Sequence, residues 1–134
     1  PAFPDTSPVL RLCDVRAPQR ELEAALGVAL HRFGPYRKGP GTYAQVNFRS
    51  GADWGEIVAE FHRFGPALKL AVERGHIARP ILDVGLFIPE ESLPRGLIFP
   101  YLLCQALGRY GVELELSVYP SSADDEETAA PVSD

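Results

Sequence analysis

PILDVGLFIP, residues 80–89, is the most apolar stretch of the chain. A continuous run of this kind, rich in Ile and Leu and only ten residues long, is typical of a strand in the interior of a sheet. We therefore expect it to form a central strand of a sheet. Asp83 is the only charged residue of this run. Because a buried carboxylate needs partners, we expect an arginine or a backbone amide to pair with it.

Three other segments alternate apolar and polar side chains, which is typical of strands with one buried face. They are residues 9–16, 42–49 and 112–119. In the second of them, Tyr43 and Gln45 fall on the polar side, whereas Ala44 and Val46 fall on the buried side. The pattern also allows a short strand near residues 28–33.

Helical periodicity separates these strands. The predicted helices cover residues 18–26, 54–74 and 100–110. Asp53 is expected to act as the N-cap of the second helix. Gly65-Pro66 predicts a break within that helix, after which Pro66 starts a further helix that ends at Gly75.

The alternation of strands and helices along the chain predicts the α+β class. With only three helical segments, we expect a single sheet of four to five strands, mixed or mostly antiparallel, with the helices mainly on one face. Residues 9–120 are predicted to form this one domain, after an N-terminal extension of residues 1–8. A length of 134 residues suits a single hydrophobic core.

The formal net charge of −5 belongs to one end of the chain. Residues 121–134 contain five acids and no base, so we expect an acidic, disordered tail there. The remaining 13 acids and 13 bases balance within residues 1–120. Inside that balanced part, residues 24–52 contain four bases and no acid.

The first candidate site is this basic segment, in which long cationic side chains stand beside aromatic ones of the kind that anchor interfaces. We expect six of its residues to contact a partner or an anion: Arg32, Tyr36, Arg37, Lys38, Tyr43 and Arg49. The simpler alternative is a solvated basic surface without a ligand. A phosphate-binding loop is not expected, because Pro40 stands where a P-loop needs a lysine.

The second candidate site rests on the pentapeptide HRFGP, which occurs at residues 31–35 and again at residues 62–66. The flanking sequences differ, so the two copies do not indicate a structural repeat. In the simpler interpretation, each is a Gly-Pro stop preceded by an aromatic anchor. In the alternative, the copies line one pocket in which His31, His62 and Arg63 bind an anion.

Several classes of protein are not expected from this sequence. It has no run of about 18 apolar residues for a membrane span, no signal-peptide pattern and no known nucleic-acid motif. The histidines lack metal-ligand spacing and no catalytic motif is present, so we expect no metal, cofactor or catalytic residue. Cys13 and Cys104 are expected to be buried, reduced thiols, which favours a cytoplasmic location.

Three stretches of the chain resemble a known family. They are ELEAALGVALHRFGPYRKGPGTYAQVNF (residues 21–48), ILDVGLFIP (81–89) and LIFPYLLCQALGRYGVELELSVYP (97–120). In length and in the order of its elements, the segment 9–120 resembles the bacterial domain-of-unknown-function family numbered 4279. The resemblance implies a small intracellular α+β protein of bacteria, and it carries over no catalytic residue.

These features lead to three hypotheses about function. The first is a non-enzymatic protein-binding module, most concretely an immunity-type protein that neutralises a bacterial toxin encoded nearby. The second is a small anion-binding protein or an enzyme that uses the two HRFGP segments. The third is a homodimeric structural module that pairs an exposed edge strand such as residues 42–49.

Overall fold

The computed structural model describes residues 6–89 and 97–121 of the chain. The predicted N-terminal extension lies outside these residues up to position 5, and the predicted acidic tail lies outside them from position 122. The described elements are β1 (Thr6–Val15), α1 (Gln19–Leu26), β2 (His31–Pro35), β3 (Thr42–Asn47), α2 (Trp54–Glu73), β4 (Ile77–Pro89), α3 (Tyr101–Tyr110) and β5 (Glu113–Ser121).

The predicted α+β class is confirmed, because the described strands form a single mixed sheet of five in the order β2-β3-β1-β4-β5. Neighbouring strands are antiparallel except β4 and β5, which are parallel and are joined by the crossover through α3. The apolar run 80–89 lies inside the sheet, between β1 and β5, within a strand that begins at Ile77.

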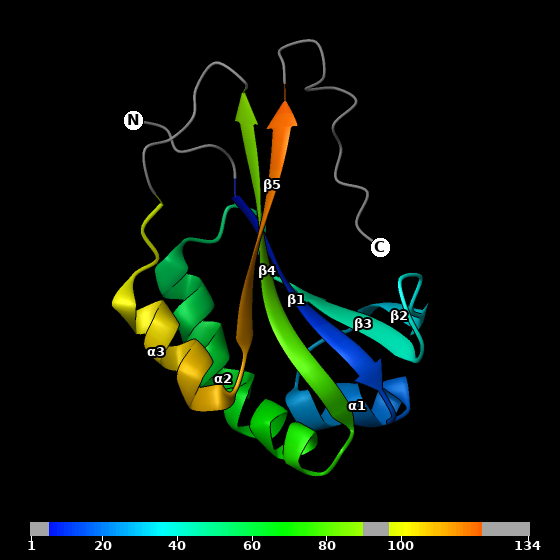
Figure 1. Cartoon of the computed structure of the whole chain (residues 1–134). Coiled ribbons are helices and arrows are strands. Elements are labelled where there is room, and N and C mark those ends of the chain that lie inside the picture. The colour runs from blue at the N-terminus through cyan, green and yellow to red at the C-terminus, as the bar shows by residue number, and fades with distance from the viewer. Residues whose placement is uncertain (1–5, 90–96, 122–134) are drawn as a thin grey trace.

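The three helices lie on one face of this sheet, as predicted, with α1 toward the β2 side and α3 toward the β5 side (Figure 1). α2 lies between them and contacts both. Side chains from both layers are fully buried between sheet and helices: Leu10, Leu12, Leu82 and Val84 from the strands, and Leu22, Ile57, Phe61, Phe64, Leu68 and Leu103 from the helices. Removal of this apolar area from water is the main term that holds the layers together.

The start of α2 agrees with the sequence, but its interior does not. Asp53 is the N-cap, and its carboxylate accepts a 2.8 Å hydrogen bond from the backbone N–H of Glu56. The break expected at Gly65-Pro66 is wrong, since α2 continues through both residues as one helix of 20 residues. A proline in a helix interior costs about 3 kcal/mol. The apolar stripe buried on both sides of it, which includes Phe61 and Leu68, outweighs that cost.

β3 also departs from the expectation in two ways. The segment 42–49 was expected to bury one face, yet Tyr43 and Gln45 of its polar face are 3% and 5% exposed, because Tyr36 and neighbouring strands cover them. In addition, β3 lies between β2 and β1 and is not an edge strand. The hypothesis of a homodimer through residues 42–49 is therefore wrong, because both backbone edges of this strand are already paired.

Two further expectations need correction. β1 begins at Thr6, not at residue 9, because residues 6–8 pair with β4 in continuous register. Cys13 is half-buried and Cys104 is exposed, so the expectation of two buried thiols is wrong for Cys104; both are free. Cys104 lies on α3 outside its buried stripe of Leu103, Ala106 and Leu107.

Within the described ranges, no helix is long and apolar enough to cross a membrane.

Candidate functional site

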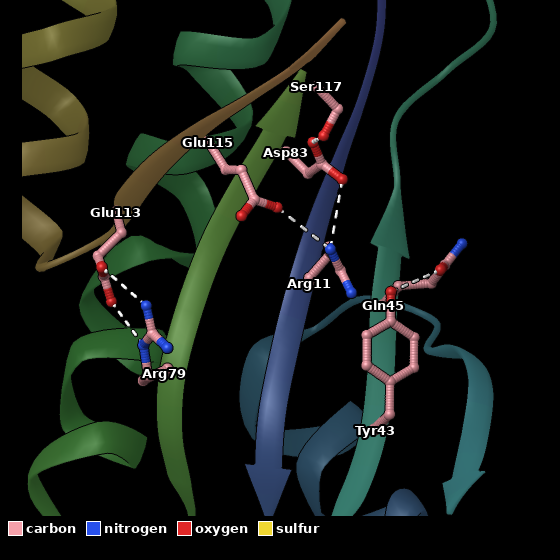
Figure 2. A network of polar contacts seen from close by, with 8 residues as sticks. All are labelled: Arg11, Tyr43, Gln45, Arg79, Asp83, Glu113, Glu115 and Ser117. Carbon is pink, nitrogen blue, oxygen red and sulfur yellow. Dashed lines mark hydrogen bonds and ion pairs between the residues drawn. The ribbon is translucent and has the colours of Figure 1, made fainter. Parts of the chain in front are cut away.

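The face of the sheet that the helices leave open carries the candidate site (Figure 2). Side chains alternate along a strand, so Leu10 and Leu12 of β1 pack toward the helices while Arg11 between them points to the open face. The strand register places Gln45 of β3 opposite Arg11. On β4, Ile81 is opposite Arg11, and Asp83 lies two residues farther along on the same face.

Arg11 is the centre of this face. Its Nη1 lies 3.5 Å from Oδ2 of Asp83 and 3.2 Å from Oε1 of Glu115, and its side chain is only 13% exposed. The Ser117 hydroxyl donates a 2.9 Å hydrogen bond to the other oxygen of Asp83. The prediction that an arginine pairs with Asp83 is thus confirmed. The cluster joins β1, β4 and β5 through side chains as well as through the backbone (Figure 2).

Tyr43 on β3 forms the aromatic part of the face. Its ring stacks on that of Tyr36 with centroids 5.6 Å apart and planes at 12°, and the guanidinium carbon of Arg11 is 5.5 Å from its centroid. Its hydroxyl donates to Oε1 of Gln45 at 2.9 Å, and Nε2 of Gln45 donates to Oδ1 of Asn47 at 2.7 Å. A chain of hydrogen bonds therefore runs along β3 and orients the buried amide of Gln45.

Burial and two arginines act on the pKa of Tyr43 in opposite directions. Burial raises the pKa of Tyr43, and the positive charges of Arg11 and Arg32 oppose that rise. Burial likewise raises the pKa of Cys13, which follows Arg11 by two residues and shares its face of β1. Both groups are therefore held in their neutral forms at neutral pH, with ordinary pKa values already above 7.

Arg79 and Glu113 form a second ion pair on the open face, between β4 and β5 (Figure 2). Nε and Nη2 of Arg79 donate to the two carboxylate oxygens of Glu113 at 2.9 and 3.1 Å. These hydrogen bonds lower the pKa of Glu113. Because both side chains are more than half exposed, this pair adds little stability, but its fork geometry fixes where the two charges stand.

The structure brings together only some of the six predicted binding residues. Tyr36 and Tyr43 stack, and the positive charge of Arg32 opposes the rise in the pKa of Tyr43. Arg37 and Lys38 follow Tyr36 in the turn between β2 and β3, and both are exposed.

Arg49 is the exception among the six, because it lies beyond the opposite end of β3, near the start of α2. Its guanidinium donates to both carboxylate oxygens of Glu56 at 2.9 and 2.6 Å and to the carbonyl of Ser50 at 3.0 Å. Arg49 therefore holds the connection between β3 and α2 and does not belong to the candidate site. The expectation that Arg49 contacts a partner stays a prediction, separate from the other five residues.

The alternative pocket of His31, His62 and Arg63 is not assembled. His31 lies on β2, the edge strand farthest from α3, whereas Nδ1 of His62 lies 2.7 Å from the hydroxyl of Tyr110 on α3. Arg63 points the other way around α2, where it donates to both oxygens of Glu60 and to the carbonyl of Gly27. The two copies of HRFGP thus serve separate parts of the packing, and the expectation of a shared pocket is corrected.

Sequence reasoning missed most of the residues that build the open face. Arg11, Glu115 and Ser117 each stand on the polar side of an alternating strand, which is a visible signal. Their mutual contact depends on β1, β4 and β5 being neighbours, and the alternation alone does not contain that order. Among the residues that the structure describes, no group of three or more His, Cys, Asp and Glu side chains is arranged to hold a metal ion.

Comparisons with known proteins do not place this chain in a family. No family model matches the sequence, no curated protein matches it, and no solved structure matches the fold. The resemblance to the bacterial family numbered 4279 stays a prediction.

Proposed function

We propose that this chain is a non-enzymatic protein-binding module that meets its partner with the open face of the sheet and the turn beside it. The observation that carries the proposal is the stack of Tyr36 on Tyr43, which is itself held under the guanidinium of Arg11. Through this stack, a buried and hydrogen-bonded ring supports the exposed turn that presents Arg37 and Lys38.

Preorganisation is what favours recognition of a macromolecule at such a surface. Side chains that are already ordered by neighbours lose little conformational entropy when a partner binds. Tyr36 is half-buried against Tyr43, and the charges of Arg11 and Arg79 are fixed by carboxylates of neighbouring strands. Tyrosine and arginine are also the residue types that most often dominate protein interfaces.

The most concrete form of this function is an immunity-type protein that neutralises a bacterial toxin encoded nearby. The cationic pair Arg37 and Lys38 at the rim suits a partner with an acidic patch, and charge complementarity of this kind accelerates association. The ion pairs of Arg11 with Glu115 and of Arg79 with Glu113 hold positive and negative charges at fixed positions. They therefore favour a partner whose polar groups have the complementary arrangement.

The test is co-expression of the full chain with the products of neighbouring genes, followed by affinity capture and growth assays. The double variant Arg37→Glu with Lys38→Glu should lower the association rate roughly tenfold or more at low salt. The matched control, Lys69→Glu with Arg74→Glu, makes the same charge change at exposed positions of α2 and of the residue that follows it, and should leave the rate within about twofold. Absence of any partner, or equal effects of the two variants, would contradict the proposal.

A further inference from the structure

The sheet has two edges, and they differ in how well they are protected against further pairing. β2 has five residues, its register with β3 shifts between His31 and Gly34, and Arg32 within it has φ +54°. Short length, irregular register and a terminal proline all discourage pairing with another strand. β5, in contrast, has nine residues in unbroken register with β4, and β4 is its sole neighbour among the described strands.

β5 also carries apolar side chains that the described part of the chain leaves partly uncovered. Leu114, Leu116 and Val118 stand on the helix side of the sheet, and they are 40%, 45% and 52% exposed. Their neighbours on β4 in the same register, Leu82 and Val84, are fully buried. The apolar layer therefore continues to the end of the sheet, but the helices cover it only as far as β4.

The position of α3 explains this exposure. α3 packs mainly against α2 and makes far fewer contacts with β5. The beginning of the helix is exposed as well, with Tyr101 at 76%, Leu102 at 48% and the preceding Ile98 at 83%. Single exposed apolar residues are ordinary, but a row along an open strand edge beside the nearest helix is typical of an interface.

We propose that β5 pairs with β5 of a second copy, antiparallel about a two-fold axis normal to the sheet, so that two five-stranded sheets join into one. Such an axis keeps the helices of both copies on the same face. The rows of Leu114, Leu116 and Val118 from the two copies then lie next to each other and cover one another. The interface is isologous, as in most homodimers.

The residues of β5 favour one register for this pairing. With Leu116 opposite Leu116 of the other copy, Leu114 faces Val118, Glu115 faces Ser117 and Glu113 faces Tyr119. No carboxylate then stands opposite another, and Pro120, which has no N–H to donate, stays outside the paired core. A register centred on Leu114 would instead place Glu113 opposite Glu115, where like charges repel.

Charge and area both favour a second copy as the occupant. Glu113 and Glu115 are already paired with Arg79 and Arg11 of their own chain, so two copies meet without an uncompensated charge on either side. Nine residues give an edge about 30 Å long. A stable dimer buries about 800 Å² on each partner, so the strand needs the exposed start of α3 to reach that area, and both belong to the same side of the molecule (Figure 1).

The first test measures the mass of the full chain in solution by sedimentation or light scattering between about 1 and 200 µM. A dimer of about 29 kDa, twice the chain mass of 14.7 kDa, is expected at the upper end. Leu116→Lys should weaken the dimer roughly tenfold or more. The control Leu70→Lys introduces the same charge on α2 at a leucine of similar exposure, 44%, and should leave dimerisation unchanged. A monomer at all concentrations, or equal effects of the two variants, would overturn the proposal.

The second test measures the register by disulfide trapping in a Cys13→Ser, Cys104→Ser background. Residues directly opposite in an antiparallel pair have Cα atoms about 4.5–5.5 Å apart, within the range that a disulfide spans. Leu116→Cys should therefore form a covalent dimer on mild oxidation. Leu114→Cys, on the same strand and face, should remain monomeric because its own copy lies several residues away. Efficient trapping through Leu114→Cys, and not through Leu116→Cys, would refute the register.

Discussion

Residues 31–35 and 62–66 have the same sequence, HRFGP, and adopt different secondary structures. The first copy is the edge strand β2, and the second lies in the middle of α2. The same five residues therefore have an extended backbone in one place and a helical backbone in the other, and a proline is tolerated in both. Because the local sequence is identical, the difference must come from the residues that surround each copy. Comparison of the two copies therefore isolates the effect of the surroundings on a fixed sequence.

The surroundings of the two copies differ most at the phenylalanine and at the glycine. Phe64 is 1% exposed and its ring lies 5.3 Å from that of Phe61, whereas Phe33 is half-buried at the margin of the core. A Cβ added to Gly65 would stand 2.5 Å from the ring of Tyr110, whereas a Cβ added to Gly34 meets no atom within 4 Å. Paired substitutions at equivalent positions therefore separate the contribution of context from that of the residue itself.

The largest difference is expected at the phenylalanines. Phe64→Ala should lower the free energy of unfolding by about 3–5 kcal/mol, since it removes a fully buried ring and leaves a cavity between α2 and the sheet. Phe33→Ala should cost about half of that or less, because its ring is partly solvated and water can fill the space. Urea denaturation of both variants measures the difference. Equal losses would mean that the edge strand is as tightly packed as the core.

The glycines should differ next. Gly65→Ala forces a methyl group into the ring of Tyr110 and should destabilise the protein by about 1–3 kcal/mol, even though alanine favours a helix over glycine. Gly34→Ala should change stability by less than about 0.5 kcal/mol, because the site is open. Thermal unfolding of the two variants gives the comparison. A stabilised Gly65→Ala variant would show that Tyr110 moves aside at no cost.

The histidines should give a smaller contrast. His62→Ala removes the contact between its Nδ1 and the hydroxyl of the buried Tyr110, and the expected loss is about 1 kcal/mol, reduced by the higher helix propensity of alanine. His31→Ala changes an exposed side chain of β2 and should stay within about 0.5 kcal/mol. The same denaturation assay applies to both. A combined Tyr110→Phe, His62→Ala variant no less stable than either single variant would confirm that the two groups act on each other.

The arginines should differ least in stability and most clearly in pH dependence. Hydrogen bonds from Arg63 lower the pKa of Glu60 below the ordinary value of 4.5. A lowered pKa contributes stability above the unfolded-state value, and that contribution is lost as the pH falls through the folded-state value. Arg63→Ala should therefore cost at most about 0.5 kcal/mol near neutral pH through this surface pair, with the difference shrinking in acid.

Titration of the Glu60 carboxyl by NMR gives the direct measurement of that pair. Its pKa should rise in the Arg63→Ala variant and stay unchanged in the Arg32→Ala variant, which alters the equivalent residue of the first copy. A part of the loss in Arg63→Ala should persist in acid, because Arg63 also donates to the carbonyl of Gly27 at the end of α1. An unchanged pKa in both variants would show that the Glu60 pair does not form in solution.

Local patterns in the sequence were sufficient to predict most of the elements. The alternation in β1, β3 and β5 and the helical periodicity of α1, α2 and α3 are properties of single segments, because backbone geometry sets which residues share a face. A local stretch of sequence is therefore enough to reveal them. α1 and α3 end at residues 26 and 110, as predicted, and the glycine that follows each helix, Gly27 or Gly111, has the left-handed conformation. The partner of Asp83 was also predictable from local sequence, because a carboxylate within an apolar run is expected to be buried and to need a partner.

The order of the strands and the contacts between distant elements depend on long-range packing, which these local patterns do not contain. The order β2-β3-β1-β4-β5 brings Arg11 of one strand to Asp83 and Glu115 of two others, and it leaves β5 rather than β3 at the edge. The ring of Tyr110, far along the chain, lies where Gly65 leaves room for it. Periodicity tells which face of an element is apolar, but not which other element covers that face. That is why HRFGP is a strand at the edge of the sheet and a helix against α3.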